Sequence, residues 1–245
     1  MGTEARKLES VDAARETLLL TGSAGRVASL VSPVLRREFR LRRLDVVSQR
    51  PEADDEIFEA DVREVDAVIE ACAGVSAVVH FAAQPAEADF RSVLLPQNLD
   101  GTWAVFEAAV QAAVPRFVFA STVQTVDGNP TGTRVSPEMM PRPVSVYGCT
   151  KLFGEALGRF HADTSGLGVA CLRLGAVVSP DDPRLANEDR FRHLWCGAND
   201  LARLISAAVG SEVPYATVIA VSPPATLRFD TANPFGWVPS EEPVF

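Results

Sequence analysis

Short apolar runs alternate with amphipathic segments through most of this chain, and that alternation constrains the fold more than any other feature. The runs that read as buried strands are residues 17–20, 39–47, 57–62, 75–81, 117–120 and 169–174. Strands that are separated by helices pair in parallel, so the pattern predicts an α/β fold with a doubly wound parallel sheet. Ligands of such sheets bind beyond the carboxyl ends of the strands, and we expect the functional side chains there.

Charge and composition exclude several classes of partner. The net charge of −9 argues against a general binder of nucleic acids or of anionic membranes. No apolar run reaches the length of about 18 residues that a membrane span needs, and residues 1–16 lack the apolar centre of a signal peptide. The four cysteines are scattered along the chain. This spacing predicts reduced packing residues in a cytoplasmic protein and no metal site.

A glycine-rich turn follows the first strand. Residues 21–28 read Thr-Gly-Ser-Ala-Gly-Arg-Val-Ala, and apolar positions at helical spacing come directly after them. Glycines in this context permit a tight turn and let backbone N–H groups approach a pyrophosphate at a helix N-terminus. The turn therefore predicts a Rossmann fold that binds a dinucleotide. The residues assigned to this contact are Gly22, Ser23, Ala24, Gly25, Arg26 and Val27.

An acid at the end of the second strand indicates which nucleotide is bound. Asp45 follows Gly25 by 20 residues, which is the spacing of a carboxylate that accepts hydrogen bonds from the adenosine ribose. That carboxylate would repel a 2′-phosphate, so NAD is favoured over NADP. The nearby Arg26, Arg42 and Arg43 keep NADP open as the less favoured cofactor.

Small or acidic residues also follow the third and fourth strands. Alanines after the fourth strand leave room for a flat cofactor to cross the strand end. The residues assigned to the cofactor site in these two places are Asp61, Val62, Phe81, Ala82 and Ala83. His80 is interpreted as a packed histidine rather than a ligand.

A tyrosine and a lysine carry the predicted chemistry. Tyr147 and Lys151 lie four residues apart at the start of an amphipathic segment, so they share one face of a helix. A free tyrosine has a pKa of about 10, and an ammonium one turn away favours the phenolate and lowers that pKa. A phenol in this position can take a proton from an alcohol or return it to a carbonyl.

From Leu18 to about Ala220 the chain resembles the extended short-chain dehydrogenase/reductase family, also described as the NAD-dependent epimerase/dehydratase family. The resemblance rests on the order of the glycine turn, Asp45, Asp61-Val62, His-Phe-Ala-Ala at 80–83, Asn-x-x-Gly-Thr at 98–102, Ser121-Thr122 and Tyr147-x-x-x-Lys151. The family implies a Rossmann fold and a nicotinamide cofactor.

The resemblance also implies roles for individual residues. It implies a catalytic triad of Thr122, Tyr147 and Lys151, in which Thr122 replaces the usual serine and orients the substrate alcohol. It implies that Asp61-Val62 contacts the adenine, that Asn98 belongs to the cofactor site, and that Lys151 also hydrogen-bonds the nicotinamide ribose.

Within the family the chain is most similar to uronate dehydrogenases, which oxidise hexuronic acids with NAD. It shares with them Tyr-Gly-x-x-Lys-x-Phe-Gly-Glu at 147–155, Arg-Leu-Gly at 173–175 and Phe-Gly-Trp-Val-Pro at 235–239. Several polar positions of their substrate site differ here, which predicts a related reaction on a less polar substrate. An arginine for a substrate carboxylate corresponds to either of two arginines near 190. The residues assigned to the substrate site are Pro85, Thr122, Val123, Gln124, Ala176, Arg190 and Arg192.

These observations predict an NAD-dependent oxidoreductase that transfers a hydride between nicotinamide and an alcohol or carbonyl carbon of a small, sugar-derived substrate. Two alternatives stay open. One is a sugar or sugar-nucleotide epimerase, although epimerases of the family usually carry a C-terminal lobe larger than the 72 residues that follow Arg173. The other is a catalytically silent NAD-binding sensor or scaffold, which an intact Thr122, Tyr147 and Lys151 disfavours.

The expected organisation has three parts. They are a polar tail over 1–16, a Rossmann cofactor-binding core with the catalytic helix over 17–175, and a small substrate-capping portion over 176–245 that completes the same domain. Family members often dimerise through the helices that include the tyrosine helix, so a homodimer is a further expectation. The acidic segment 240–243 is expected to be solvated.

Overall fold

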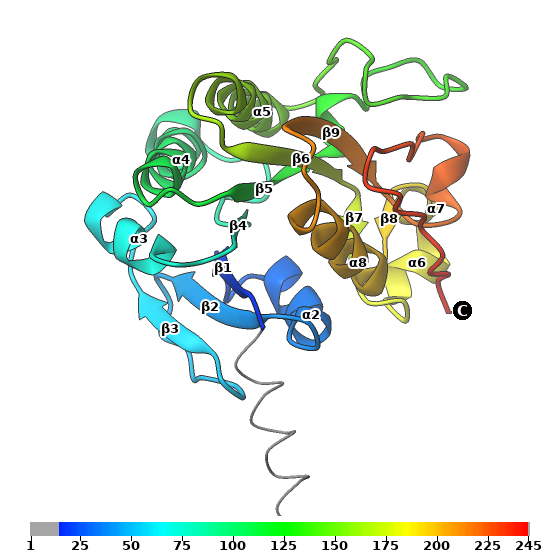
Figure 1. Cartoon of the computed structure of the whole chain (residues 1–245). Helices are drawn as coiled ribbons and strands as arrows, with labels where there is room; N and C mark the ends of the chain where they lie inside the picture. The colour runs from blue at the N-terminus through cyan, green and yellow to red at the C-terminus, as the bar shows by residue number, and fades with distance from the viewer. Residues whose placement is uncertain (1–14, 245) are drawn as a thin grey trace, which may run out of the picture.

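A seven-stranded sheet forms the centre of the computed structural model, which describes residues 15–244. The strands run in the order β3-β2-β1-β4-β5-β6-β9, and every neighbouring pair is parallel (Figure 1). They are β1 (Thr17–Thr21), β2 (Arg40–Asp45), β3 (Glu56–Glu59), β4 (Ala77–His80), β5 (Arg116–Thr122), β6 (Gly168–Leu174) and β9 (Tyr215–Ala220). The predicted doubly wound Rossmann fold is confirmed. The strand order reverses between β1 and β4, which is where such sheets bind their ligands.

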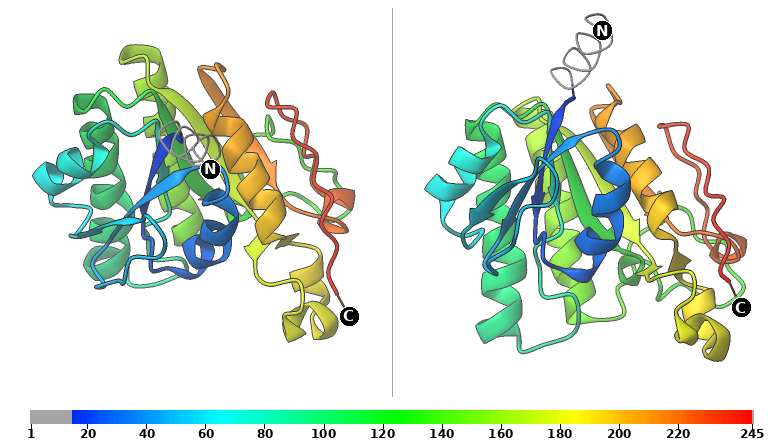
Figure 2. Two further views of the ribbon diagram at one scale, coloured as in Figure 1. Left: turned by 60° about the horizontal axis from the view of Figure 1, so that its bottom comes forward. Right: turned by 90° about the horizontal axis from the view of Figure 1, so that it is seen from below.

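Helices cover both faces of this sheet (Figures 1 and 2). One face carries α3 (Val65–Cys72), α4 (Gly101–Gln111) and α5 (Val146–Thr164), and the other carries α2 (Arg26–Leu35) and α8 (Ala198–Val209). Alternate residues of a strand point to opposite faces of the sheet. In β1, Leu19 packs with the first set of helices, whereas Leu18 and Leu20 pack with the second. Because both faces are covered, the inner strands β1, β4, β5 and β6 are mostly apolar and buried, whereas β2 and β3 at one edge carry charged residues.

The sheet extends beyond the boundary expected at residue 175. The portion from 176 onward contributes β9 to the edge of the sheet and α8 to one of its faces. It also holds a separate pair of short parallel strands and two short helices. These are β7 (Ala176–Val177), α6 (Pro183–Asn187), α7 (Asp189–Arg192) and β8 (Trp195–Cys196).

The C-terminal segment crosses the N-terminus of α8 and is held there. The buried Asp200 carboxylate accepts hydrogen bonds from the Ser222 hydroxyl (2.6 Å) and from the backbone N–H of Ser240 and Glu241. In return, the Glu241 carboxylate accepts from the backbone N–H of Asn199 at 3.0 Å. The expectation that segment 240–243 is solvated is therefore wrong for Glu241, because the free N–H groups at a helix N-terminus attract its carboxylate, whereas Ser240 is exposed.

The N-terminal part of the described chain is tied to the sheet. The expected tail, 1–16, lies outside the described residues except for Arg15 and Glu16. Arg15 forms an ion pair with Asp54 (2.8 Å), and the Glu16 carbonyl accepts from the backbone N–H of Arg40 (2.9 Å). None of the helices between residues 15 and 244 is long and apolar enough to cross a membrane.

Candidate active site

The glycine turn packs the end of β1 against the end of β4. Gly22 has a φ of +67°, and a Cβ on it would lie 2.5 Å from the backbone nitrogen of Ala82. Only glycine fits both constraints. Gly25 donates its N–H to the Gly22 carbonyl at 3.0 Å and caps α2. The turn thus places the N-terminus of α2 at the carboxyl edge of the sheet, where a helix N-terminus favours an anionic group.

Asp45 holds this turn in place. Its carboxylate accepts hydrogen bonds from the backbone N–H of Ala24 (2.9 Å) and of Val47 (3.0 Å). Ser23 is fully buried, and its hydroxyl accepts from the side-chain amide of Gln49 at 2.8 Å. The contacts leave the Asp45 carboxylate beside the first of two cavities.

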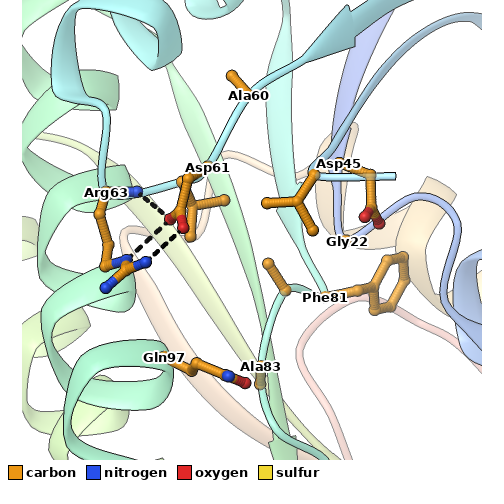
Figure 3. A pocket seen from close by; sticks show the side chains of 11 residues that line it. Gly22, Asp45, Ala60, Asp61, Arg63, Phe81, Ala83 and Gln97 are labelled. Carbon is orange, nitrogen blue, oxygen red and sulfur yellow. Dashed lines mark hydrogen bonds and ion pairs between the residues drawn. The ribbon is translucent and has the colours of Figure 1, made fainter. Parts of the chain in front are cut away.

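The first cavity, of about 260 Å³, lies beyond β1, β2 and β4 (Figure 3). Its lining is Gly22, Asp45, Val46, Ala60, Asp61, Val62, Arg63, Phe81, Ala82, Ala83 and Gln97. Every residue assigned to the cofactor from the ends of the second, third and fourth strands is in this set. Asp61 is paired with Arg63 at 2.6 Å, and the guanidinium holds the pKa of that carboxyl below its usual value.

The second cavity, of about 420 Å³, contains the predicted catalytic side chains. The residues that the sequence assigned to the site and that line this cavity are Arg26, Val27, Phe81, Ala83, Pro85, Thr122, Val123, Gln124, Tyr147, Lys151, Ala176 and Arg190. Phe81 and Ala83 line both cavities, so the two are neighbours. An extended molecule could therefore occupy both.

Five assigned residues line neither cavity: Ser23, Ala24, Gly25, Asn98 and Arg192. The first three shape the turn. Asn98 is buried and bridges two segments: its side-chain oxygen accepts from the N–H of Gln84 (2.8 Å), and its amide donates to the Thr150 hydroxyl (3.0 Å). It braces the strand-end loop against the catalytic helix. Arg192 is paired with Asp189, so Arg190 is the arginine of the two that faces the cavity.

The start of α5 is fixed by side chains from two other segments. The Ser145 hydroxyl accepts from the N–H of Gly148 (2.9 Å) and donates to the side-chain oxygen of Gln124 (2.7 Å). The Glu87 carboxylate accepts from the N–H of Tyr147 at 3.0 Å. These bonds satisfy orphan donors of the first helical turn and orient it. Tyr147 and Lys151 therefore sit on a rigid support next to Thr122.

Burial governs the pKa values of Tyr147 and Lys151. It raises the pKa of Tyr147 to about 12, and hydrogen bonding with the Thr122 side chain opposes that rise. It lowers the pKa of Lys151 to about 7. The Lys151 nitrogen lies 5.9 Å from the centre of the Tyr147 ring. The prediction that Lys151 brings the tyrosine pKa below its usual value is wrong for this geometry, because desolvation outweighs the hydrogen bond with Thr122, the one contribution that lowers this pKa.

His80 is enclosed beneath this pair. It is fully buried, with Nδ1 2.7 Å from the Thr21 hydroxyl and Nε2 3.3 Å from the Thr102 hydroxyl. Burial, together with the charge of Lys151, lowers its pKa to about 3. The imidazole is thus neutral, and its interpretation as a packed histidine is confirmed.

A buried ion pair connects β5, α5 and β6. Arg173 donates to both carboxylate oxygens of Glu155, at 2.9 and 2.8 Å, and the Ser121 hydroxyl donates to the same carboxylate at 2.5 Å. Arg173 also donates to the carbonyl of Pro137 at 3.0 Å. The motifs containing Glu155 and Arg173 were visible in the sequence, but spacing alone does not show that the two side chains meet.

The sequence did not identify the residues that α6 and α7 bring to the second cavity. Arg184, Glu188 and Phe191 line it, and the Arg184 guanidinium lies 4.6 Å from the centre of the Phe191 ring. Arg184 is held by Asp182 at 2.7 Å. The Asp-Pro pair before Arg184 is a helix-start signal that could have located α6.

A doubly wound parallel sheet, a glycine turn at the end of β1, and a tyrosine–lysine pair beside the nucleotide cavity together define a dinucleotide-dependent oxidoreductase of the Rossmann type. Residues 18–209 match the model of the NAD-dependent epimerase/dehydratase family, and the chain belongs to this family. The match confirms the predicted family and, because the family is NAD dependent, the predicted enzyme class and cofactor.

Individual members of the family that are similar to this chain include sugar dehydrogenases. An NAD-dependent glucose-6-phosphate dehydrogenase from Haloferax volcanii is 31% identical over 84% of this chain and 85% of its own length. A uronate dehydrogenase from Pseudomonas syringae pv. tomato is 30% identical over 87% of this chain and 77% of its own. The crystal structure of uronate dehydrogenase from Agrobacterium tumefaciens is 29% identical with a TM-score of 0.84, over 94% of this chain and 86% of that one. The predicted similarity to uronate dehydrogenases is confirmed.

Proposed function

We propose that this protein is an NAD-dependent dehydrogenase that oxidises an alcohol carbon of a small, sugar-derived substrate or reduces the corresponding carbonyl. One observation carries the proposal: Thr122, Tyr147 and Lys151 meet in a cavity that adjoins the nucleotide cavity. The relatives named as dehydrogenases of glucose 6-phosphate and of uronates support a sugar-derived substrate.

The residues present fit NAD. Gly22 and Gly25 carry no side chain at the turn, so a pyrophosphate could approach the N-terminus of α2 there. Asp45 would hold the adenosine ribose. Arg42 is occupied by Glu56 (2.7 Å) and Arg43 by Gln49 (2.5 Å), so neither guanidinium is free to bind the 2′-phosphate of NADP. These contacts support NAD over NADP.

Each catalytic side chain has a distinct task. NAD, when bound, supplies the hydride acceptor. Thr122 donates a hydrogen bond to the substrate oxygen and orients the carbon that reacts. Tyr147 exchanges a proton with that oxygen, and Lys151 stabilises the phenolate form. With a pKa of about 12, Tyr147 is a protonated phenol at neutral pH. It is therefore ready to donate to a carbonyl, whereas oxidation requires that it first lose its proton.

The walls of the cavity suggest which substrate it takes. Val123, Ala176 and Pro85 present apolar surface, and the Gln124 side-chain oxygen already accepts a hydrogen bond from Ser145. Arg190 is exposed at the cavity and forms no ion pair with any residue between 15 and 244. We infer a substrate with one less polar face and an anionic group that meets Arg190.

A spectrophotometric screen tests this proposal. NADH formation is followed with uronates, sugar phosphates and less polar secondary alcohols, each with NAD and with NADP. We expect NAD to be preferred and glucuronate and galacturonate to be poor substrates. Efficient turnover of either uronate would contradict the inferred substrate site. Tyr147→Phe should bind NAD normally and show no turnover, and normal turnover by that variant would refute the catalytic assignment.

The arginine assignment has its own matched pair of variants. Arg190→Met should raise KM for an anionic substrate and leave kcat within about threefold, because it removes a binding contact. Arg192→Met, two residues away and outside the cavity, is the control. Equal effects from the two variants would contradict the role given to Arg190.

The oligomeric state and location complete the proposal. The four unpaired cysteines support a reducing, cytoplasmic compartment.

The exposed aromatic side chains Trp103 of α4 and Phe160 of α5 support a homodimer that buries these helices. Light scattering of the protein and of Trp103→Glu tests the dimer, which the variant should weaken.

A further inference from the structure

The ammonium of Lys151 lies against an aromatic ring inside the protein. Lys151 is 3% exposed, and its nitrogen is 5.0 Å from the centre of the Phe119 ring. No residue between 15 and 244 forms a hydrogen bond or an ion pair with that nitrogen. The groups that face the ammonium are two aromatic rings, that of Phe119 and that of Tyr147, whose centre lies 5.9 Å from the nitrogen. A cation over a ring face is attracted to it, and more strongly when both are desolvated.

The Phe119 ring is held in place from two sides. A Cβ on Gly154, three residues after Lys151 in α5, would lie 2.2 Å from the tip of the ring. The ring thus occupies a notch in the catalytic helix that only glycine provides. On another side it stacks with His80 at 6.0 Å between ring centres and an interplanar angle of 23°. A fixed ring is a defined platform for the ammonium.

The charged groups around Lys151 supply no counter-charge. His80 of β4 is neutral, and Tyr147 on the same helix is protonated. Glu155, one turn further along α5, is bound in both oxygens by Arg173 of β6. Glu107 of α4 faces His161 of α5 at 3.6 Å. The Phe119 ring therefore stabilises the Lys151 charge in the position where a buried lysine is often paired with a carboxylate.

We propose that Phe119 is a positioning residue that acts through Lys151: its ring face binds the ammonium, favours the charged form of Lys151 and holds it beside Tyr147. The consequence for catalysis rests on the proposed function. The contact itself does not, and it is testable without substrate or NAD.

The composition of the chain makes a direct measurement practical. The only lysines in the sequence are Lys7 and Lys151. Protein labelled with ¹³C at the lysine ε carbon therefore gives two NMR signals, and Lys151→Arg identifies the one that belongs to Lys151. Titration of that signal yields the pKa of Lys151. In Phe119→Leu we expect this pKa to fall by about one pH unit, because the aliphatic side chain removes the attraction of the ring.

Phe117→Leu is the matched control. Phe117 lies on the same strand, is equally buried, and packs in the same layer, but its ring stacks on Phe106 at 3.9 Å and not on Lys151. It should leave the Lys151 pKa within about 0.3 pH unit of the wild-type value. An unchanged pKa in Phe119→Leu, or an equal fall in both variants, would overturn the proposal.

Two further measurements test the proposal: NMR of Lys151 in the wild-type protein and the pH dependence of kcat. If Phe119→Leu does not fold, the wild-type protein still decides: the ε protons of Lys151 should be shifted upfield and show cross-peaks to a phenylalanine ring, and their absence would overturn the proposal. In active protein, the pH dependence of kcat should shift in Phe119→Leu and not in Phe117→Leu. If the Lys151 pKa falls as expected but no dehydrogenase activity is found, the proposed function fails and the lysine–ring contact stands.

Discussion

Replacing Lys151 with methionine should abolish turnover and yet stabilise the protein at neutral and acidic pH. Methionine keeps most of the apolar stem and removes a charge that the folded chain buries. The pKa of Lys151 is about 7 in the folded protein against a usual value of 10.5. This difference corresponds to about 5 kcal/mol of lost stability wherever the lysine is protonated in both states.

The sign of the pH dependence follows from the same two values. Between about pH 7 and 10.5 the unfolded chain binds more protons than the folded one, so the stability of the wild type rises with pH across this window. Below pH 7 the full cost is present. From pH 6 to pH 9 the lysine should add about 3 kcal/mol to the stability of the wild type. The methionine variant lacks this contribution, so its advantage should be largest at pH 6 and small near pH 10.

Urea unfolding at several pH values between 6 and 10 measures the effect. The difference between variant and wild type cancels the contributions of titrating groups that Lys151 does not perturb, and His80, whose pKa of about 3 Lys151 helps to lower, is neutral in the folded protein over this range. Equal m-values show that the unfolded states are comparable. The rise in the pKa of Tyr147 changes stability only above its usual value of 10.0, outside this range. A stability difference that does not vary with pH, or a variant that is less stable at pH 6, would refute the claim that burial depresses the lysine pKa.

Two substitutions and one pH profile test other parts of the site. Gly22→Ala forces a Cβ to within 2.5 Å of the Ala82 backbone and should lower NAD affinity at least about tenfold by calorimetry. Glu155→Leu leaves the buried Arg173 unpaired and should cost about 3–5 kcal/mol in urea unfolding, much of which the double variant Glu155→Leu/Arg173→Met should recover; no recovery would contradict this. Because the pKa of Tyr147 is about 12 in the free protein, kcat/KM for oxidation should rise continuously from pH 7 to pH 10, and a plateau below pH 8 would contradict that value.

The part of the site at the strand ends could be predicted from the sequence because strand periodicity fixes it. In a parallel sheet the carboxyl ends of all strands lie on one edge, so Asp45 and Thr122 had to lie near the glycine turn. Helical spacing likewise placed Tyr147 and Lys151 on one face of α5. These assignments needed no knowledge of how side chains pack.

Properties that depend on packing were not accessible in this way. The spacing of Tyr147 and Lys151 gave the right neighbours and the wrong direction for the tyrosine pKa, because spacing carries no measure of desolvation. The α6–α7 segment lacks the periodicity of a longer helix, so the contribution of Arg184 was missed. Glu241 looked like part of an acidic tail, and its role at the N-terminus of α8 appears only when the chain folds back on itself.

The pKa of Tyr147 is raised and that of Lys151 is lowered, and together these shifts set the free energy of forming the phenolate that oxidation requires. Moving a proton from the phenol to the amine spans pKa values of about 12 and about 7, which corresponds to about 7 kcal/mol. Two unit charges separated by 5.9 Å, the distance from the Lys151 nitrogen to the ring centre, attract by about 3 kcal/mol at an effective dielectric constant of about 20. About 4 kcal/mol is left for hydrogen bonds to the two charges, or about two charge-assisted bonds. Thr122 already acts on the tyrosine pKa, so we expect the further bonds from bound ligands, with the alcohol of the proposed substrate as a donor to the phenolate. On the proposed function, the base that removes the substrate proton would therefore form in the complex with the substrate, not before it binds.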